Sequence, residues 1–147
     1  SPLSGQVKEL SQATDPVFAQ GVMGQGVLIE PSQGDLLAPV DGVVSVLFPT
    51  KHAVGIVSDQ GVEMLMHIGM DTVNLEGKGF TAHVSQGDRV KAGDKLISFD
   101  IDLIKDAGYV TETPVIITNQ DQYQADALGS LPRQIAVGDA LMTATKI

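Results

Sequence analysis

Turn-forming residues interrupt this sequence at short intervals, and no other feature limits its possible folds as much. Sixteen glycines and seven prolines separate short apolar runs that are rich in valine and isoleucine. Such runs are typical of strands, and turn signals about every ten residues are typical of antiparallel sandwiches and barrels. We therefore predict an all-β chain with strands over residues 27–29, 43–48, 54–57, 62–68, 95–99 and 115–118.

Only one helix is expected, over residues 101–107. Asp100 can cap its first turn, and Gly108 can end it because glycine accepts the left-handed backbone at a helix C-terminus. Leu103, Ile104 and Ala107 share one apolar face. Such a short helix depends on packing for its stability, so we expect at most one or two short helical turns in the chain.

Two pairs of segments resemble each other. SPLSGQV at residues 1–7 is similar to APVDGVV at residues 38–44, and VKAGDKL at 90–96 is similar to IAVGDAL at 135–141. The two spacings differ, so the chain is no regular solenoid. We predict that one turn-and-strand unit occurs twice in a duplicated β structure. No linker or low-complexity stretch divides the chain, so residues 1–147 are expected to form one domain.

Two histidines flank a predicted hairpin. Ser-Asp-Gln-Gly at residues 58–61 separates two apolar runs, which is a hairpin signal. A two- or four-residue loop centred between Asp59 and Gln60 would place His52 directly opposite His67 on one face, about 5 Å apart at Cβ. A three-residue loop would make them diagonal neighbours. Thr50 shares the face of His52 if the strand extends so far.

Paired imidazoles suit phosphoryl transfer. A neutral histidine has one bare nitrogen that can attack phosphorus, while the other nitrogen holds the proton and needs an acceptor to fix it. A second imidazole about one strand away can donate to the phosphoryl oxygens, and a threonine hydroxyl can orient that second ring. Positioning and charge stabilisation carry most of this chemistry, so no metal or other cofactor is expected.

Other interpretations of these histidines stay open on the pattern alone. Each could be a hydrogen-bonded structural residue, and their register could be coincidence. His52, His67 and Asp71 could also ligate zinc, since catalytic zinc sites use three protein ligands plus water. No His-x-His or Glu-x-x-His motif accompanies them. His83 lies in an unrelated polar stretch and is expected at the surface.

The histidine segments resemble a known family. Pro-Thr-Lys-His-Ala at residues 49–53 and Glu-Met-Leu-Met-His-Ile-Gly-Met-Asp-Thr-Val at 63–73 are similar to the active-site signature of the glucose-type IIA proteins of the bacterial sugar phosphotransferase system. The resemblance continues at residues 15–18, 23–26 and 38–42 upstream, and at 75–80, 87–90 and 113–115 downstream. It covers nearly the whole chain. The hydrophobic opening tail with which some relatives touch membranes is not in this sequence, so we expect no membrane insertion by this chain.

The resemblance implies both a fold and a function. The fold is an antiparallel β-sandwich or barrel-sandwich with a duplicated hybrid motif and a shallow active-site depression. His67 would take a phosphoryl group from the phosphocarrier protein HPr and pass it to a cysteine of a sugar-specific IIB domain, in a separate or the same polypeptide, which drives sugar uptake. His52 would stabilise the phosphohistidine, and Thr50 would orient His52.

The resemblance also implies a docking surface. Asp15 and Asp71 match acidic positions that meet arginines of the partner. The apolar ring that docks both partners is matched by Val17, Phe18, Phe48 and Leu65. A small apolar patch rimmed by carboxylates suits a transient basic partner. Ordinary core packing remains an alternative for Phe18 and Phe48, and a turn position for Asp71.

Composition restricts the remaining functions. The formal net charge of −9 argues against nucleic-acid binding, which needs clustered lysine and arginine. The chain has no cysteine, which excludes disulfides, thiolate zinc sites and cysteine nucleophiles. It shows neither an apolar run long enough for a membrane helix nor a secretion signal. We expect a cytoplasmic location, either free or as the cytoplasmic domain of a membrane permease.

Two further functions compete with phosphoryl transfer. A biotinyl or lipoyl carrier domain would share the small β architecture and would present a modifiable lysine in a hairpin turn. Lys51 precedes a strand but lacks the flanking residues that such modules use. A regulatory binding module of the same fold, acting by contact alone, is the other alternative.

Overall fold

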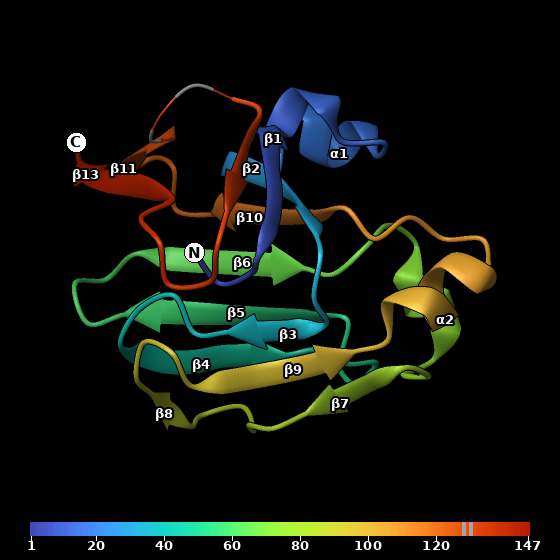
Figure 1. Cartoon of the computed structure of the whole chain (residues 1–147). Coiled ribbons are helices and arrows are strands. Elements are labelled where there is room, and N and C mark those ends of the chain that lie inside the picture. The colour runs from blue at the N-terminus through green and yellow to red at the C-terminus, as the bar shows by residue number, and fades with distance from the viewer. Residues whose placement is uncertain (128, 130) are drawn as a thin grey trace.

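The computed structural model describes residues 1–127, 129 and 131–147, and almost all of its regular structure is strand (Figure 1). The two short α-helices are α1 (Pro16–Ala19) and α2 (Ile101–Asp106), and the two 3-10 turns are η1 (Leu10–Gln12) and η2 (Thr72–Leu75). The strands are β1 (Gly5–Glu9), β2 (Gln25–Pro31), β3 (Asp35–Leu37), β4 (Gly42–Leu47), β5 (Ala53–Ser58), β6 (Glu63–His67), β7 (Phe80–Ala82), β8 (Arg89–Val90), β9 (Lys95–Phe99), β10 (Thr113–Ile117), β11 (Tyr123–Ala127), β12 (Arg133–Ile135) and β13 (Met142–Lys146).

The main sheet is antiparallel and has eight strands in the order β12-β1-β2-β10-β6-β5-β4-β8. A three-stranded sheet, β3-β9-β7, packs on one of its faces, and β11 and β13 form a two-stranded sheet. Figure 1 shows β11 and β13 at one end of the molecule and α2 at the other. The all-β sandwich predicted from the turn spacing is confirmed.

The predicted duplication is also confirmed. The order of the main sheet divides into two halves, in which β1, β2, β10 and β12 correspond to β4, β5, β6 and β8. Gly5 on β1 lies opposite Ile135 on β12, and Gly42 on β4 lies opposite Val90 on β8. Both glycines begin their strands where a side chain has no room. A Cβ would lie 2.0 Å from the carbonyl oxygen of Glu30 at Gly5, and 2.2 Å from that of Val57 at Gly42.

The repeated Gly-Asp turns make the same bonds in both halves. The Gly93 amide donates to the Ala38 carbonyl at 2.8 Å, and the Gly138 amide donates to the Ser1 carbonyl at 2.9 Å. The Asp94 carboxylate accepts from the Lys91 amide at 2.9 Å, and the equivalent Asp139 carboxylate accepts at 3.1 Å. The two pairs of similar segments are therefore one structural unit used twice.

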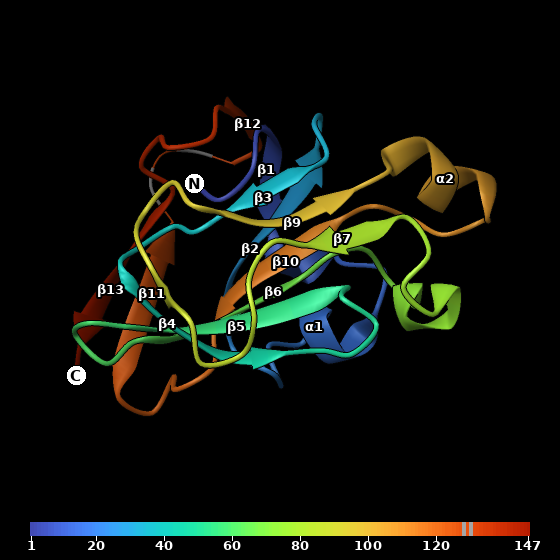
Figure 2. The same cartoon turned by 90° about the horizontal axis from the view of Figure 1, so that it is seen from below.

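Apolar residues divide between the two faces of the main sheet. One face packs against β3, β7 and β9, with Val54, Met66 and Val115 among its fully buried residues. The opposite face carries a smaller cluster with η1 and α1, which lie on the side away from β9 (Figure 2). Phe18 of α1 and Leu65 of β6 belong to this second cluster. The second face is the one that holds the histidines.

Each of the six predicted strands falls on β2, β4, β5, β6, β9 or β10, with ends that differ by at most two residues. The predicted helix is α2, and the Asp100 carboxylate accepts from the Leu103 amide at 3.1 Å, as a cap does. The expectation of a single helix is wrong in detail, because α1 also forms. Among the described residues, no helix is long and apolar enough to cross a membrane.

Candidate active site

The two histidines lie at the same ends of neighbouring strands, but not in the predicted register. The hairpin loop is residues 59–61, since the Ser58 amide donates to the Val62 carbonyl at 2.9 Å. His67 therefore pairs with Ala53, and the directly opposed arrangement with His52 is wrong by one residue. The three-residue loop considered as the alternative is the one that forms. Glycine at position 61 makes it possible, with φ at 95°.

His52 reaches His67 because it lies just before β5, where the chain turns. Lys51 has φ at 62°, so strand alternation does not continue backwards through this position. The Ile68 amide donates to the His52 carbonyl at 2.7 Å, which fixes the backbone beside β6. The two imidazole rings meet edge to face, with centroids 4.8 Å apart and planes 83° apart. The predicted pairing of the rings thus arises from a turn and not from a strand.

One nitrogen of His67 is fixed by the backbone. Its Nδ1 lies 2.8 Å from the carbonyl oxygen of Gly69. A carbonyl can only accept, so Nδ1 carries the proton, and in the neutral ring Nε2 keeps its lone pair. Gly69 has φ at 75°, a conformation that glycine adopts without strain. The sequence suggests such a carbonyl acceptor in general terms, and the structure identifies Gly69.

Thr50 holds the other ring. Its Oγ1 lies 2.6 Å from Nδ1 of His52. The contact spans the turn at residues 48–51, in which the Lys51 amide donates to the Phe48 carbonyl at 2.8 Å. The strand does not extend to Thr50, so the condition for a shared strand face is not met, and the two side chains meet through the turn instead. Lys51, the candidate lysine of a carrier domain, is exposed within this turn.

Burial keeps both rings neutral. Burial, and to a smaller extent the charge of the neighbouring His67, lower the pKa of His52 to about 4. Burial also lowers the pKa of His67. The bond to the Gly69 carbonyl and the charges of Asp15 and Asp71 oppose that effect. The site therefore presents an uncharged nucleophile at neutral pH, with two carboxylates near enough to stabilise any positive charge that develops on it.

Apolar side chains surround the pair. The Phe18 ring lies 5.1 Å from the His67 ring, and the Phe48 ring packs edge to face on His52 at 5.3 Å, between centroids. Phe18 and Leu65 are buried, so core packing describes them as well as a docking role does. Val17 is 45% exposed on α1. All nine predicted site residues thus belong to the histidine pair or to the elements around it.

Several exposed apolar residues near the site were not predicted. Val22 and Met23 follow α1, Val73 lies in η2, and Val110 precedes β10. The Val110 carbonyl accepts from the Met70 amide at 3.3 Å, which places this loop beside the turn at Gly69. None of these residues belongs to an apolar pattern with the period of a strand or a helix. Only their position in the fold therefore identifies them as candidate contact residues.

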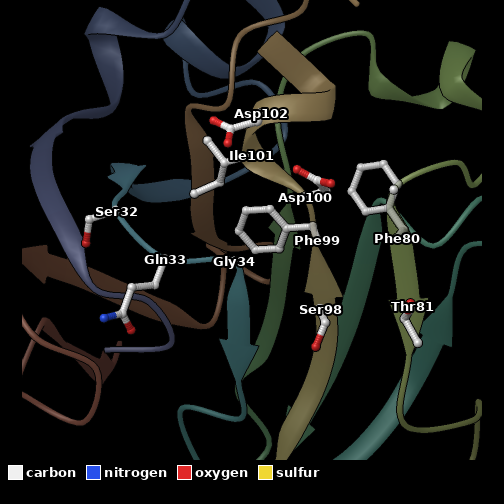
Figure 3. A pocket seen from close by; sticks show the side chains of 11 residues that line it. Ser32, Gln33, Gly34, Phe80, Thr81, Ser98, Phe99, Asp100, Ile101 and Asp102 are labelled. Atoms are coloured by element: carbon white, nitrogen blue, oxygen red, sulfur yellow. The ribbon is translucent and has the colours of Figure 1, made fainter. Parts of the chain in front are cut away.

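The alternative sites lie elsewhere or lack their ligands. Among the described residues, no group of three His, Asp or Glu side chains is arranged to hold a metal ion, so His52, His67 and Asp71 do not form the zinc site considered above. His83 is exposed, as predicted, with Nε2 2.8 Å from Oγ of Ser98. An open groove of about 680 Å³ lies beside Phe80, Phe99 and Asp100 (Figure 3). It is lined by none of the predicted site residues.

The site can therefore perform one kind of chemistry with its own groups. A neutral imidazole with a fixed Nδ1–H offers Nε2 as a nucleophile, and a second ring stands beside it. Val17 of α1 and Val73 of η2 are exposed apolar side chains on elements next to the pair, and such side chains can contact a macromolecule. A hollow of about 470 Å³ on the same side of β5 and β6 is lined by Phe48 and Leu65, and neither histidine lines it.

Comparison with known proteins agrees with this site. Residues 1–123 match the model of a family described as phosphoenolpyruvate-dependent sugar phosphotransferase system, EIIA 1. The glucose-specific EIIA component of Bacillus cereus is 54% identical over 82% of this chain and 73% of its own length. The beta-glucoside-specific EIIBCA component of Bacillus subtilis is 58% identical over 84% of this chain, but only 20% of its own length.

The solved structures agree as well. The glucose permease IIA from Mycoplasma capricolum superposes with a TM-score of 0.87 at 37% identity, covering 97% of this chain and 91% of that one. The chain spans about a fifth of the length of the longer curated relatives it matches, in which EIIA is one part of a larger protein. The chain belongs to the EIIA 1 family of the phosphoenolpyruvate-dependent sugar phosphotransferase system, and is thus a phosphotransferase component of that system.

Proposed function

We propose that His67 is the residue that carries the phosphoryl group. The observation that supports this most directly is the bond from Nδ1 to the Gly69 carbonyl, which leaves Nε2 unprotonated on a partly exposed ring. The Nε2 lone pair forms a bond to phosphorus while the bond from phosphorus to the donor breaks, and the electrons of that bond stay with the donor. In onward transfer, an acceptor thiolate attacks phosphorus and the N–P electrons return to Nε2.

His52 stabilises the phosphohistidine in this proposal. The Thr50 hydroxyl donates to Nδ1 of His52, so the ring carries its proton on Nε2 and can donate to a phosphoryl oxygen on His67. Burial supports this role, because a ring with a pKa of about 4 stays neutral and is a donor without adding a positive charge to the free site. His52 then lowers the energy of the transferring group without being durably phosphorylated itself.

The partners follow from the family and from the surface. We infer that HPr is the donor and that a cysteine of a IIB domain is the acceptor, either separate or in the same polypeptide. The longer relatives support the second arrangement, since their names join the A, B and C parts. Asp15 and Asp71 are the carboxylates that meet basic groups of both partners, and the apolar contact is made by Val17, Phe18, Phe48 and Leu65. Residues 1–147 act as one domain, since strands from both ends of the chain pair in the same sheet.

A labelling experiment tests this proposal. The protein is incubated with phosphoenolpyruvate, enzyme I and HPr, and it should acquire an acid-labile, base-stable phosphoryl group. His67→Ala should abolish the label. His83→Ala is the matched control, because His83 directly follows β7 of the three-stranded sheet and contacts Ser98 of β9. This variant should label fully. Full labelling of His67→Ala would exclude His67 as the carrier.

The role of His52 needs a second measurement. His52→Gln keeps a side-chain donor of similar reach, and it should still accept the phosphoryl group but pass it on slowly. The readout is the rate of onward transfer to a IIB domain. Transfer at the wild-type rate would remove His52 from the mechanism. Intact mass of the isolated protein separately tests the carrier hypothesis, which predicts an adduct on Lys51.

A further inference from the structure

The Gly69 carbonyl that orients His67 belongs to a tight turn, and Thr72 packs into that turn. Thr72 is fully buried, although it is the first residue of η2. Its hydroxyl donates to the Ile68 carbonyl at 2.5 Å. Its methyl group occupies the space beside Gly69, where an added Cβ would lie 2.6 Å from Cγ2 of Thr72. Both ends of this side chain therefore contact the backbone next to His67.

Two peptide planes meet at Gly69, and different bonds hold them. The plane between Ile68 and Gly69 is held through the Ile68 carbonyl by the Thr72 hydroxyl. The plane between Gly69 and Met70 carries the Gly69 carbonyl, which accepts from His67. The Met70 amide of this plane donates to the Val110 carbonyl at 3.3 Å, which is longer than the bond of Thr72. The short bond of Thr72 is thus the firmer attachment of the turn, since hydrogen bonds weaken with distance.

Thr72 also fixes the residue before it. Asp71 has φ at 59°, and its side chain makes no cap bond to η2. A non-glycine residue in this conformation is held there by its surroundings. The buried side chain of Thr72 is the adjoining anchor, so the position of the Asp71 carboxylate near His67 depends on it as well.

We propose that Thr72 is a positioning residue for His67. Its hydroxyl holds the Ile68 carbonyl so that the Gly69 carbonyl accepts the Nδ1 proton, and this selects the tautomer in which Nε2 is free to attack phosphorus. The transfer step in this inference rests on the proposed function, whereas the choice of tautomer does not. Thr50 would then fix the orientation of the His52 ring, and Thr72 would fix that of the His67 ring.

Three variants separate this role from ordinary core packing. Thr72→Val keeps the shape and removes the hydroxyl, and Thr72→Ser keeps the hydroxyl. Thr113→Val is the matched control, because Thr113 is another fully buried threonine, with a hydroxyl that donates to the Thr111 carbonyl at 2.9 Å on β10. The first measurement is the nitrogen-15 NMR spectrum of the His67 ring in the unphosphorylated protein at pH 8. The second is the rate of phosphorylation by HPr.

The wild type should show the Nδ1–H tautomer alone. Thr72→Val should shift His67 toward the Nε2–H tautomer and slow phosphorylation about three- to tenfold, the loss expected for one hydrogen bond. Thr72→Ser should keep the wild-type spectrum. Thr113→Val should lose stability without changing the spectrum. If Thr72→Val does not fold, Thr72→Ala removes the same hydroxyl without adding a methyl group against the Ile68 carbonyl and should shift the tautomer likewise.

An unchanged His67 tautomer in the folded variant that lacks the Thr72 hydroxyl would overturn the inference, and so would an equal shift in Thr113→Val. These outcomes are distinct from a failure of the proposed function. Wild-type protein that shows the Nδ1–H tautomer but takes no label would contradict the role of His67 and leave the role of Thr72 intact.

Discussion

At the scale of single residues, the chemistry depends on how each imidazole is held. Both rings have one nitrogen fixed at Nδ1, His67 by a backbone carbonyl and His52 by a hydroxyl. A carbonyl only accepts, whereas a hydroxyl can donate, so the two rings can take opposite tautomers. One ring then offers a lone pair and the other a proton at the same place. This difference explains how two identical side chains can have different roles.

Acid should destabilise the protein through His52. Its pKa is about 4 in the folded chain against 6.5 when unfolded, so the unfolded state binds more protons between these values. The free energy of unfolding should therefore fall as the pH is lowered from 6.5 to 4. In His52→Gln the fall should be smaller by on the order of 1–2 kcal/mol. Denaturant unfolding at several pH values measures it, and parallel curves for both proteins would contradict the expectation.

Removal of the Thr50 hydroxyl should impair transfer and not labelling. In Thr50→Val the His52 ring loses the bond that fixes its proton, so onward transfer should slow by about two- to tenfold. Thr50→Ser should behave like the wild type. Single-turnover transfer from the phosphorylated protein gives the rate. A loss in Thr50→Ser together with normal transfer in Thr50→Val would mean that the methyl group, and not the hydroxyl, matters.

At the scale of elements, α1 connects the fold to the site. It consists of Pro16–Ala19 and begins with a cap, in which the Val17 amide donates to the Asp15 carboxylate at 2.9 Å. Phe18 of this helix packs on the His67 ring. One carboxylate thus starts the helix that packs on one side of the nucleophile and also supplies negative charge beside it. These two tasks can be separated by substitution.

Asp15→Asn should keep helix α1 and slow the association with the partner protein. Asparagine caps nearly as well as aspartate, so stability should change little, while Asp15→Ala should lose about 1 kcal/mol. Both variants should associate with HPr several-fold more slowly at low salt, and the difference from wild type should vanish at high salt. Stopped-flow binding at two salt concentrations measures this. A salt-independent loss in Asp15→Asn would argue against electrostatic steering.

The elements that sequence reasoning found are those with a strong apolar pattern. Strands β5, β6 and β10 are buried and were predicted, whereas β11 and β13 are mostly exposed and were not. Helix α1 has only one turn, too short for a period. The register at the histidines was missed because Ser-Asp-Gln-Gly permits loops of two, three or four residues, and only the backbone at Gly61 decides among them.

At the scale of the whole molecule, two similar halves carry one site. His67 lies opposite Ala53, and the equivalent pair in the other half is Ile116 opposite Gly26. The connection between the first two strands also differs. Residues 10–24 form η1 and α1 over the outer face of one half, whereas residues 48–52 form only a tight turn in the other. One half of the face is therefore covered, and the other stays open at His67.

The duplication predicts matched effects at Gly5 and Gly42. An added methyl group would overlap a backbone carbonyl at both positions, so Gly5→Ala and Gly42→Ala should each lower the free energy of unfolding by about 2–3 kcal/mol. Gly87→Ala is the control for added backbone strain, because a Cβ there meets nothing within 4 Å. Thermal and denaturant unfolding measure all three. A severe loss at one of the two strand glycines alone would contradict their equivalence.

Because only one side of His67 is open, the fold also restricts the order in which partner proteins can bind. Donor and acceptor must both reach Nε2 of His67 from the side that α1 and the turn at residues 48–52 leave free. They therefore cannot be bound together, and each has to depart before the other arrives. We expect double-displacement kinetics with parallel reciprocal plots, and we expect an excess of dephosphorylated donor to act as a competitive inhibitor of the acceptor. The rate at which partners exchange then limits how fast the protein can turn over.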